Sequence, residues 1–232
     1  MADGMNKPAI RFAGFTDAWE QRKVSDVAEI ITGGTPSTTI NEYWYPKQIP
    51  WLSSGEIHKK HITYTDDKIS EEGLNHSSAR IIKEDSILIA LAGQGKTRGT
   101  VAINCIPLST NQSIAAMTFD KEIYPEFIFA NLENRYDEMR KLSSGDGSRG
   151  GLNKQLVGSI EIPYTSFEEQ RAIGNYFSNL DHLITLHQRE RKNRLFGGKN
   201  VKQYNFSRSV LQLLRAMDTR LQRRGCSQGD YG

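Results

Sequence analysis

The 232-residue chain has only two cysteines, Cys105 and Cys226, and they lie in unrelated surroundings. Such sparse cysteine excludes a disulfide framework or a cysteine-based zinc site and fits a reducing compartment, so we expect two free thiols. No apolar run approaches the roughly 20 residues that span a bilayer, and the first seven residues lack the apolar stretch of a signal peptide. The sequence therefore predicts a cytoplasmic protein that does not enter a membrane.

Patterns that carry catalysis are also missing. No metal-ligand partners stand at useful spacing from the five histidines, which are His58, His61, His76, His182 and His187. None of the seven prolines adjoins another, so the Asn/Asp-Pro-Pro-aromatic segment that holds a flipped adenine is absent, as is a glycine-rich cofactor turn. No carboxylate cluster beside a lysine suggests a nuclease centre. We expect no metal, no cofactor and no catalytic residue.

One segment, Ala90–Thr97, resembles a phosphate-binding loop in which alanine takes the place of the first glycine. Such a loop needs a helix that begins at its Lys-Thr, because the amides of that helix hold the phosphates. The residues that follow, RGTVAINCIP, favour a turn and then a strand. We interpret the segment as a hairpin with Lys96 and Arg98 at its tip, and a phosphate-loop enzyme that uses Ala90–Thr97 is the alternative function.

Charge is divided unevenly along the chain, although its net value is only +3. Residues 1–181 hold 19 Lys and Arg against 24 Asp and Glu, a net of −5, whereas residues 182–232 hold 11 against 3, a net of +8. A basic stripe is the usual footprint of a nucleic-acid binder. Any DNA-binding face on the first 181 residues must therefore be local.

Apolar spacing predicts a mixed α/β fold with a small twisted sheet and flanking helices. Residues 17–31 have the spacing of a short amphipathic helix, and residues 124–142 have that of another. Residues 49–57 read as a strand and a turn, and residues 81–103 as two buried strands joined by a glycine-rich turn. These patterns indicate a globular domain over residues 1–165.

Residues 166–232 have a different, helical character. Ser166 is a candidate N-cap for a long helix, and a coiled-coil seam is formed by Ile173, Phe177, Leu180 and Ile184. A second, more basic helix is predicted over residues 207–224. The seam predicts a homodimer through the helix at residues 167–195, since a lone amphipathic helix is poorly stable unless its apolar face is covered. Packing of this helix on its own domain, or on residues 207–224, remains the alternative.

Several phrases along residues 10–195 together resemble the specificity (S) subunits of type I restriction-modification systems. In order they are IRFAGFTDAWEQRKVSDVAEI (10–30), GGTPST (33–38), IPWLSSGEI (49–57), ILIALAGQGKTRGTVAI (87–103), LSTNQSIAAM (108–117), GGLNKQLVGSIEIP (150–163) and PYTSFEEQRAIGNYFSNLDHLITLHQR (163–189). A full-length S subunit has two target-recognition domains and two conserved helices, and this chain has one of each. Beyond Leu195 the sequence departs from the lysine-rich continuation of the family.

The resemblance implies a non-catalytic subunit that reads double-stranded DNA and carries an adenine methyltransferase (modification) subunit and an ATP-dependent restriction subunit to the site. It also implies an antiparallel arrangement of the paired helices, with one recognition domain at each end. A two-fold dimer would then read a palindromic split site.

Candidate DNA contacts are polar or cationic, stand at predicted turns and lie within or near these phrases. The expected phosphate contacts are Lys59, Lys60, Lys96, Arg98, Arg149 and Lys154. The expected base contacts are Thr35, Ser37, Ser53, Ser54, Gln94, Asn111, Gln112 and Asn153. For each of them an ordinary solvated or capping residue is the alternative.

Overall fold

The computed structural model describes residue 8 and residues 11–93, 97–142 and 151–196, the last five as backbone only. The chain forms two compact units, of which the first comprises Met1–Ile10 and Thr16–Asp181 and the second Arg11–Phe15 and His182–Gly232. Every strand of the described residues lies in the first unit.

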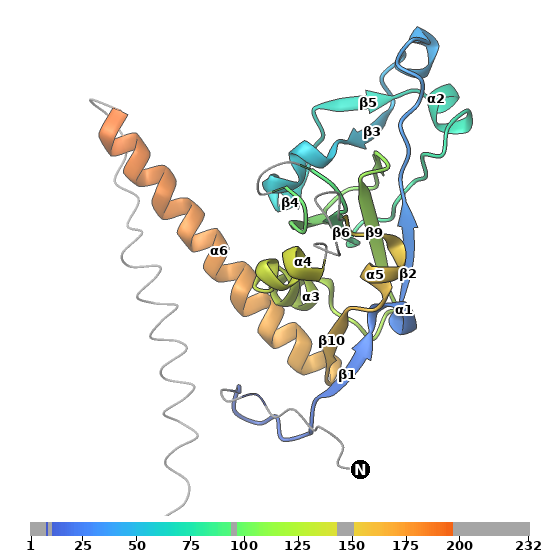
Figure 1. Ribbon diagram of the computed structural model, residues 1–232. Helices are drawn as coiled ribbons and strands as arrows, with labels where there is room; N and C mark the ends of the chain where they lie inside the picture. The colour runs from blue at the N-terminus through green and yellow to red at the C-terminus, as the bar shows by residue number, and fades with distance from the viewer. Residues whose placement is uncertain (1–7, 9–10, 94–96, 143–150, 197–232) are drawn as a thin grey trace, which may run out of the picture. The chain divides into compact units, whose positions relative to one another are not determined.

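The centre of the first unit is a five-stranded sheet in the order β2-β9-β6-β7-β4 (Figure 1). Its strands are β2 (Ala28–Thr32), β9 (Ile114–Phe119), β6 (Ile87–Ala90), β7 (Val101–Asn104) and β4 (His61–Ile62). Neighbouring strands are antiparallel except for β4 and β7. The two buried strands predicted within residues 81–103 are confirmed as the antiparallel pair β6 and β7.

The middle strand β6 separates two hydrophobic clusters. Ile87 and Ile89 belong to one cluster, Leu88 and Ala90 belong to the other, and none of the four side chains is exposed. Successive side chains of a strand point to opposite faces of the sheet, so this run fills both faces. The helix α3 (Pro125–Glu133) and the 3₁₀ helix η2 (Ser54–Lys59) both contact β6 and β7, and their apolar residues belong to opposite clusters.

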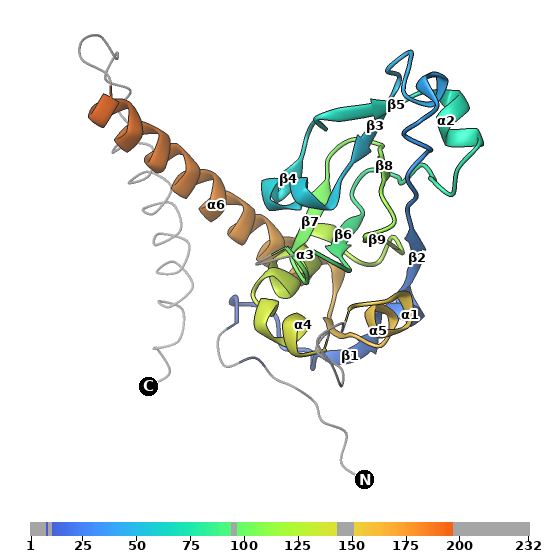
Figure 2. The same ribbon diagram turned by 45° about the horizontal axis from the view of Figure 1, so that its top comes forward.

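A smaller sheet has the order β5-β3-β8 (Figure 2). Its strands are β5 (Asp67–Ile69), β3 (Ile49–Leu52) and β8 (Ser109–Thr110). β3 runs antiparallel to β5 and parallel to β8, and the predicted strand and turn over residues 49–57 are confirmed as β3 and η2. The 3₁₀ helix η1 (Asn41–Tyr43) and the helix α2 (Glu71–Asn75) contact each other beside this sheet.

The helix predicted over residues 17–31 is wrong, because this segment forms two strands around one helical turn. β1 (Glu20–Lys23) pairs with β10 (Glu161–Tyr164), α1 (Val24–Val27) is the turn, and β2 pairs with β9. The apolar residues Val24, Val27 and Ile30 are buried. Strand pairing with distant segments, and contacts of α1 and β2 with α5 (Lys154–Gly158), override the local helical spacing.

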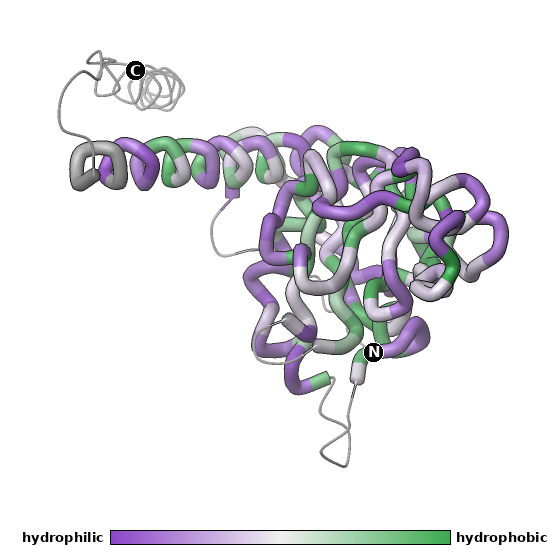
Figure 3. The backbone as a smooth tube through the Cα atoms, turned by 90° about the horizontal axis from the view of Figure 1, so that it is seen from above, coloured by the Kyte–Doolittle hydropathy of each residue, from purple (hydrophilic) through white to green (hydrophobic). Residues whose placement is uncertain are grey.

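Helical structure over residues 124–142 is confirmed as α3 and α4 (Tyr136–Leu142), and after β10 the chain enters the helix α6 (Phe167–Phe196). Hydrophobic and hydrophilic residues are interspersed along the coloured part of α6 (Figure 3). Near its start the buried Glu169 accepts hydrogen bonds from Trp19 Nε1 at 3.0 Å and Thr165 Oγ1 at 2.5 Å. Gly174 lies against Tyr124 and the backbone of Phe127, where a side chain would clash. The helix predicted over residues 207–224 lies outside the described residues.

Candidate nucleic-acid interface

Four strand ends meet at one edge of the five-stranded sheet. The ends of β2 and β6 lie beside the beginnings of β9 and β7. The strand register shows this, because Thr32 pairs with Ala115, Ala90 with Ile114, and Ile89 with Val101. In the smaller sheet, β3 and β8 are parallel, so the chain leaves both at the same end. The loops that follow or precede these strands therefore come together.

Main-chain hydrogen bonds join these loops to one another. Gly34 N donates to Thr110 O at 2.8 Å, and Asn111 N donates to Leu52 O at 3.0 Å. Leu91 N donates to Ser113 O at 2.8 Å, and Leu152 N donates to Leu91 O at 3.1 Å. We call these joined loops the loop edge. Five of the residues predicted to contact bases lie on it: Thr35, Ser53, Asn111, Gln112 and Asn153.

The glycine pair at residues 33–34 makes this close approach of backbones feasible. A Cβ atom on Gly33 would clash with the carbonyl group and the hydroxyl of Thr110, and one on Gly34 would clash with Ser78. Neither glycine has a positive φ, so the requirement is for space and not for an unusual backbone conformation. The indole of Trp51, buried below, donates to Gly34 O at 3.0 Å.

The side chains of the loop edge are polar and mostly exposed. Thr35 Oγ1 donates to Gln112 Oε1 at 2.6 Å, across 77 residues of sequence. Asn111 Oδ1 accepts from Ser113 N at 3.1 Å, and Asn153 Oδ1 caps α5 by accepting from Leu156 N at 2.9 Å. Thr35, Gln112 and Asn153 are exposed and Asn111 is half-buried. These groups present hydrogen-bond donors and acceptors from three separate segments.

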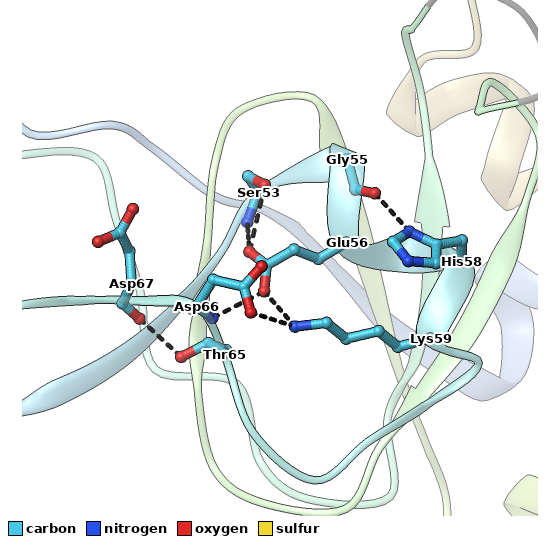
Figure 4. Close-up of polar contacts among 8 residues, drawn as sticks. All are labelled: Ser53, Gly55, Glu56, His58, Lys59, Thr65, Asp66 and Asp67. Atoms are coloured by element: carbon cyan, nitrogen blue, oxygen red, sulfur yellow. Dashed lines mark hydrogen bonds and ion pairs between the residues drawn. The ribbon is translucent and has the colours of Figure 1, made fainter. Parts of the chain in front are cut away.

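Glu56 is a buried carboxylate that organises the loop after β3 (Figure 4). Its Oε2 accepts from Ser53 N at 3.1 Å and from Ser53 Oγ at 3.2 Å. Its Oε1 accepts from Asp66 N at 2.8 Å and from Lys59 Nζ at 2.7 Å. The hydroxyl of Ser53 is therefore already engaged inside the protein. Sequence reasoning missed Glu56, although its position three residues after Ser53 has the spacing of a capping box.

Lys59 and Lys60, both predicted to contact phosphates, lie in ion pairs with carboxylates of the protein. Lys59 Nζ lies 2.7 Å from Glu56 and 2.8 Å from Asp66. Burial lowers the pKa of Lys59, but its hydrogen bonds to Asp66 and Glu56 outweigh this effect and the net shift is upward. Lys60 pairs with Glu133 of α3, and this hydrogen bond raises the pKa of Lys60. Their phosphate contacts stay a prediction, and a phosphate would compete with these carboxylates.

The other predicted contacts are spread more widely. Lys154 is exposed beside Asn153, Arg98 is half-buried at the end of the β6–β7 loop, and Ser54 is half-buried in η2. Ser37 is exposed and lies 2.9 Å from Thr39, hydroxyl to hydroxyl. Gln94, Lys96 and Arg149 lie outside the described residues. The loop between β6 and β7 leads into a strand, β7, whereas a phosphate-binding loop must be followed by a helix.

Sequence reasoning also missed a cluster of polar and aromatic residues beside the loop edge. A hollow of about 320 Å³ is lined by Thr38, Thr39, Asn41, Trp44, Tyr45, Lys47 and Asp67. The only signal in the sequence was the run of hydroxyl residues after Gly34, which continues past the predicted Thr35 and Ser37.

The predicted seam of α6 divides into one packed residue and three exposed ones. Ile173 packs against the hydrophobic cluster of its own domain. Phe177, Leu180 and Ile184 are 47%, 36% and 53% exposed. The part of the seam after Ile173 therefore presents an uncovered apolar surface on the described chain.

No three His, Cys, Asp or Glu side chains in the described part of the chain are grouped so that they could hold a metal ion. Within the same residues, no helix combines the length and the apolar character needed to cross a bilayer.

Comparison with known proteins gives one family. The model of the type I restriction modification DNA specificity domain matches residues 16–195. The MjaIX specificity subunit of Methanocaldococcus jannaschii is 31% identical over 170 residues, which are 72% of this chain and 38% of that protein. The EcoR124I/EcoR124II specificity subunit of Escherichia coli is 26% identical over 167 residues, 71% of this chain and 41% of that protein.

The fold is similar to that of a chain in a solved structure, which is described as the basis of complex assembly and conformational transition of the type I R-M system. The similarity has a TM-score of 0.60 at 16% identity and covers 83% of this chain and 45% of the other. This chain therefore spans less than half of the length of each of these three proteins.

Proposed function

Because the chain belongs to the family of type I restriction-modification DNA specificity domains, we propose that it recognises a DNA sequence and leaves the chemistry to partner subunits. The observation that carries this proposal is the loop edge, where polar side chains follow β2 and β8 and cap α5 on segments joined by main-chain hydrogen bonds. Amide side chains such as those of Asn111 and Gln112 can pair with the donor and acceptor of adenine in the major groove. Lys154 lies next to Asn153 and would contact the flanking phosphates.

The partners that we propose are double-stranded DNA, a modification (methyltransferase) subunit and a restriction subunit. The relatives in Methanocaldococcus jannaschii and Escherichia coli, described as specificity subunits of type I restriction enzymes, support this assignment. The recognition domain would comprise residues 1–165. Residues 166–232 would form the helical region that binds a partner.

We further propose that α6 pairs with α6 of a second copy in the antiparallel direction. Phe177, Leu180 and Ile184 supply an apolar surface that such a pair would cover. Charge favours the antiparallel direction. The first half of α6 carries Glu168 and Asp181 against Arg171, and the described second half carries Arg189 and Arg191 against Glu190. A parallel pair would bring like charges together along both halves, whereas an antiparallel pair places opposite charges side by side.

Selection of duplexes from a random-sequence library tests the recognition function. The full chain, mixed with its modification subunit, is expected to enrich one motif with two inverted half-sites separated by a spacer. Enrichment of no motif would overturn the proposal. Thr35→Ala with Gln112→Ala should abolish enrichment of the half-site, and Lys121→Ala, an exposed cation away from the loop edge, should leave it intact.

The loop between β6 and β7 needs a separate test. Lys96→Ala with Arg98→Ala is expected to lower the affinity for the enriched duplex and to reduce its salt dependence, because each lost phosphate contact reduces counterion release. An unchanged affinity and salt slope would show that the tip of this hairpin does not contact DNA.

A further inference from the structure

The hollow beside the loop edge has the chemistry of a nucleic-acid contact, and we call residues 38–47 the aromatic arm. The arm contributes two hydroxyls, an amide, two aromatic rings and an ammonium group to the hollow: Thr38, Thr39, Asn41, Trp44, Tyr45 and Lys47. Hydroxyl, amide and ammonium groups are the usual side-chain donors to phosphate oxygens. Exposed aromatic rings offer a stacking surface for sugars and bases.

The aromatic arm is firmly held, although Tyr45 is 55% exposed. Trp44 Nε1 donates to Ser37 O at 3.1 Å, and the Trp44 ring meets the buried Trp51 edge-on at 5.3 Å between centroids. Ser70 also fixes the main chain of the arm. Its N–H donates to Tyr43 O at 3.0 Å, and its hydroxyl donates to Glu42 O at 2.5 Å. A large ring exposed on such a fixed segment loses little conformational entropy on binding.

The aromatic arm continues directly from the loop edge. Thr38 follows Thr35 by three residues, so their Cα atoms are at most about 11 Å apart. The major groove of DNA is about 12 Å wide. A duplex whose base edges meet Thr35 and Gln112 would therefore bring the phosphate backbone that borders the groove close to Thr38, which lines the hollow.

We propose that the aromatic arm grips the DNA backbone beside the bases that the loop edge reads, with Lys47 paired to a phosphate and Tyr45 stacked on the adjoining nucleotide. This assignment rests on the proposed recognition function. Asp67 lies opposite in the hollow, and its Oδ1 is 3.2 Å from Lys47 Nζ. Both side chains of this ion pair are about half exposed, so a phosphate can replace the carboxylate as the partner of Lys47.

The test measures binding of the duplex that the wild-type chain enriches, at several salt concentrations and with the modification subunit present. Lys47→Ala is expected to weaken binding about tenfold and to reduce the salt slope by about 0.9. Tyr45→Ala should weaken binding about tenfold with the slope unchanged, because stacking releases no counterion. Asp67→Asn should tighten binding about threefold, because it removes a negative charge facing the phosphate.

Two matched variants serve as controls. Phe167→Ala removes another exposed ring, and Lys121→Ala removes another exposed cation, both outside the hollow. Both should bind like the wild type. If the wild type enriches a motif but the Lys47, Tyr45 and Asp67 variants bind it unchanged, the aromatic arm does not contact DNA and the recognition function stands. If the wild type enriches no motif, both proposals fall.

Discussion

One methyl group at position 33 is expected to disturb the whole loop edge. Gly33→Ala would place its Cβ on the carbonyl group of Thr110, which is backbone and cannot rotate away. The resulting shift should lower the free energy of unfolding by about 1–3 kcal/mol, as measured by urea denaturation. Gly55→Ala is the matched control, since its Cβ would meet nothing closer than Ser53 Oγ at 3.7 Å. Equal stability of the two variants would contradict the close contact.

The His61–Glu126 pair predicts a pH-dependent stability. His61 Nε2 lies 3.0 Å from Glu126 Oε1, and this hydrogen bond raises the pKa of His61 in the folded protein. The stabilisation is therefore fully present below the unfolded pKa of about 6.5 and is lost as the pH rises through the higher folded pKa.

Comparison of the wild type with Glu126→Gln measures this contribution. The variant should be less stable than the wild type near about pH 6, and the difference should shrink towards about pH 9. Glu72→Gln, which alters the pair with the more exposed His76, is the control and should change stability little at either pH. A difference for Glu126→Gln that stays constant with pH would show that His61 does not carry the effect.

Residue types at the loop edge could be predicted from the sequence, but their partners could not. Turn-forming segments marked Thr35, Asn111, Gln112 and Asn153 as candidates. The hydrogen bond between Thr35 and Gln112 spans 77 residues, and no local pattern reports a contact of that range. The ion pair of Lys60 was missed for the same reason, since Glu133 reaches this lysine only through the tertiary fold.

Among the elements, those with local partners were predicted best. β6 and β7 follow one another along the chain and bury continuous apolar runs, so their pattern is unambiguous. Residues 17–31 were mistaken for a helix because β1 finds its partner in β10, some 140 residues away. Of the apolar residues that gave the helical spacing, Val24, Val27 and Ile30 are buried, whereas Trp19 and Ile31 are half-buried.

The helix α6 carries the prediction of a homodimer. Phe177→Asp with Leu180→Asp should give a monomer in sedimentation, whereas the wild type should be a dimer at tens of micromolar. Burial of each apolar side chain contributes roughly 1.5–3 kcal/mol, which the aspartates remove. Ile173 is left unchanged because it packs on its own domain, where a charge would destabilise the fold itself.

Asn179→Asp, an exposed change on the same helix, is the control and should remain a dimer. A wild type that stays monomeric at this concentration would contradict self-pairing. A dimeric double variant would place the interface elsewhere.

At the scale of the whole molecule, the division of labour between subunits can be tested directly. The purified chain is expected to transfer no methyl group from S-adenosylmethionine to the enriched duplex. The modification subunit alone should show no site preference, and the two together should methylate the site. Incorporation of labelled methyl groups into DNA measures each case. Methyl transfer by the chain alone would contradict the assignment of catalysis to a partner.

The loops of the loop edge are joined through main-chain atoms, as between Gly34 and Thr110 or between Leu91 and Ser113. A peptide group makes these bonds whatever side chain it carries, proline excepted as a donor. The exposed side chains can therefore be exchanged in evolution while the framework that displays them is inherited intact. A lineage with this architecture would acquire a new target by point substitution, and a library randomised at exposed positions such as Ser37 and Gln112 should consist largely of folded proteins.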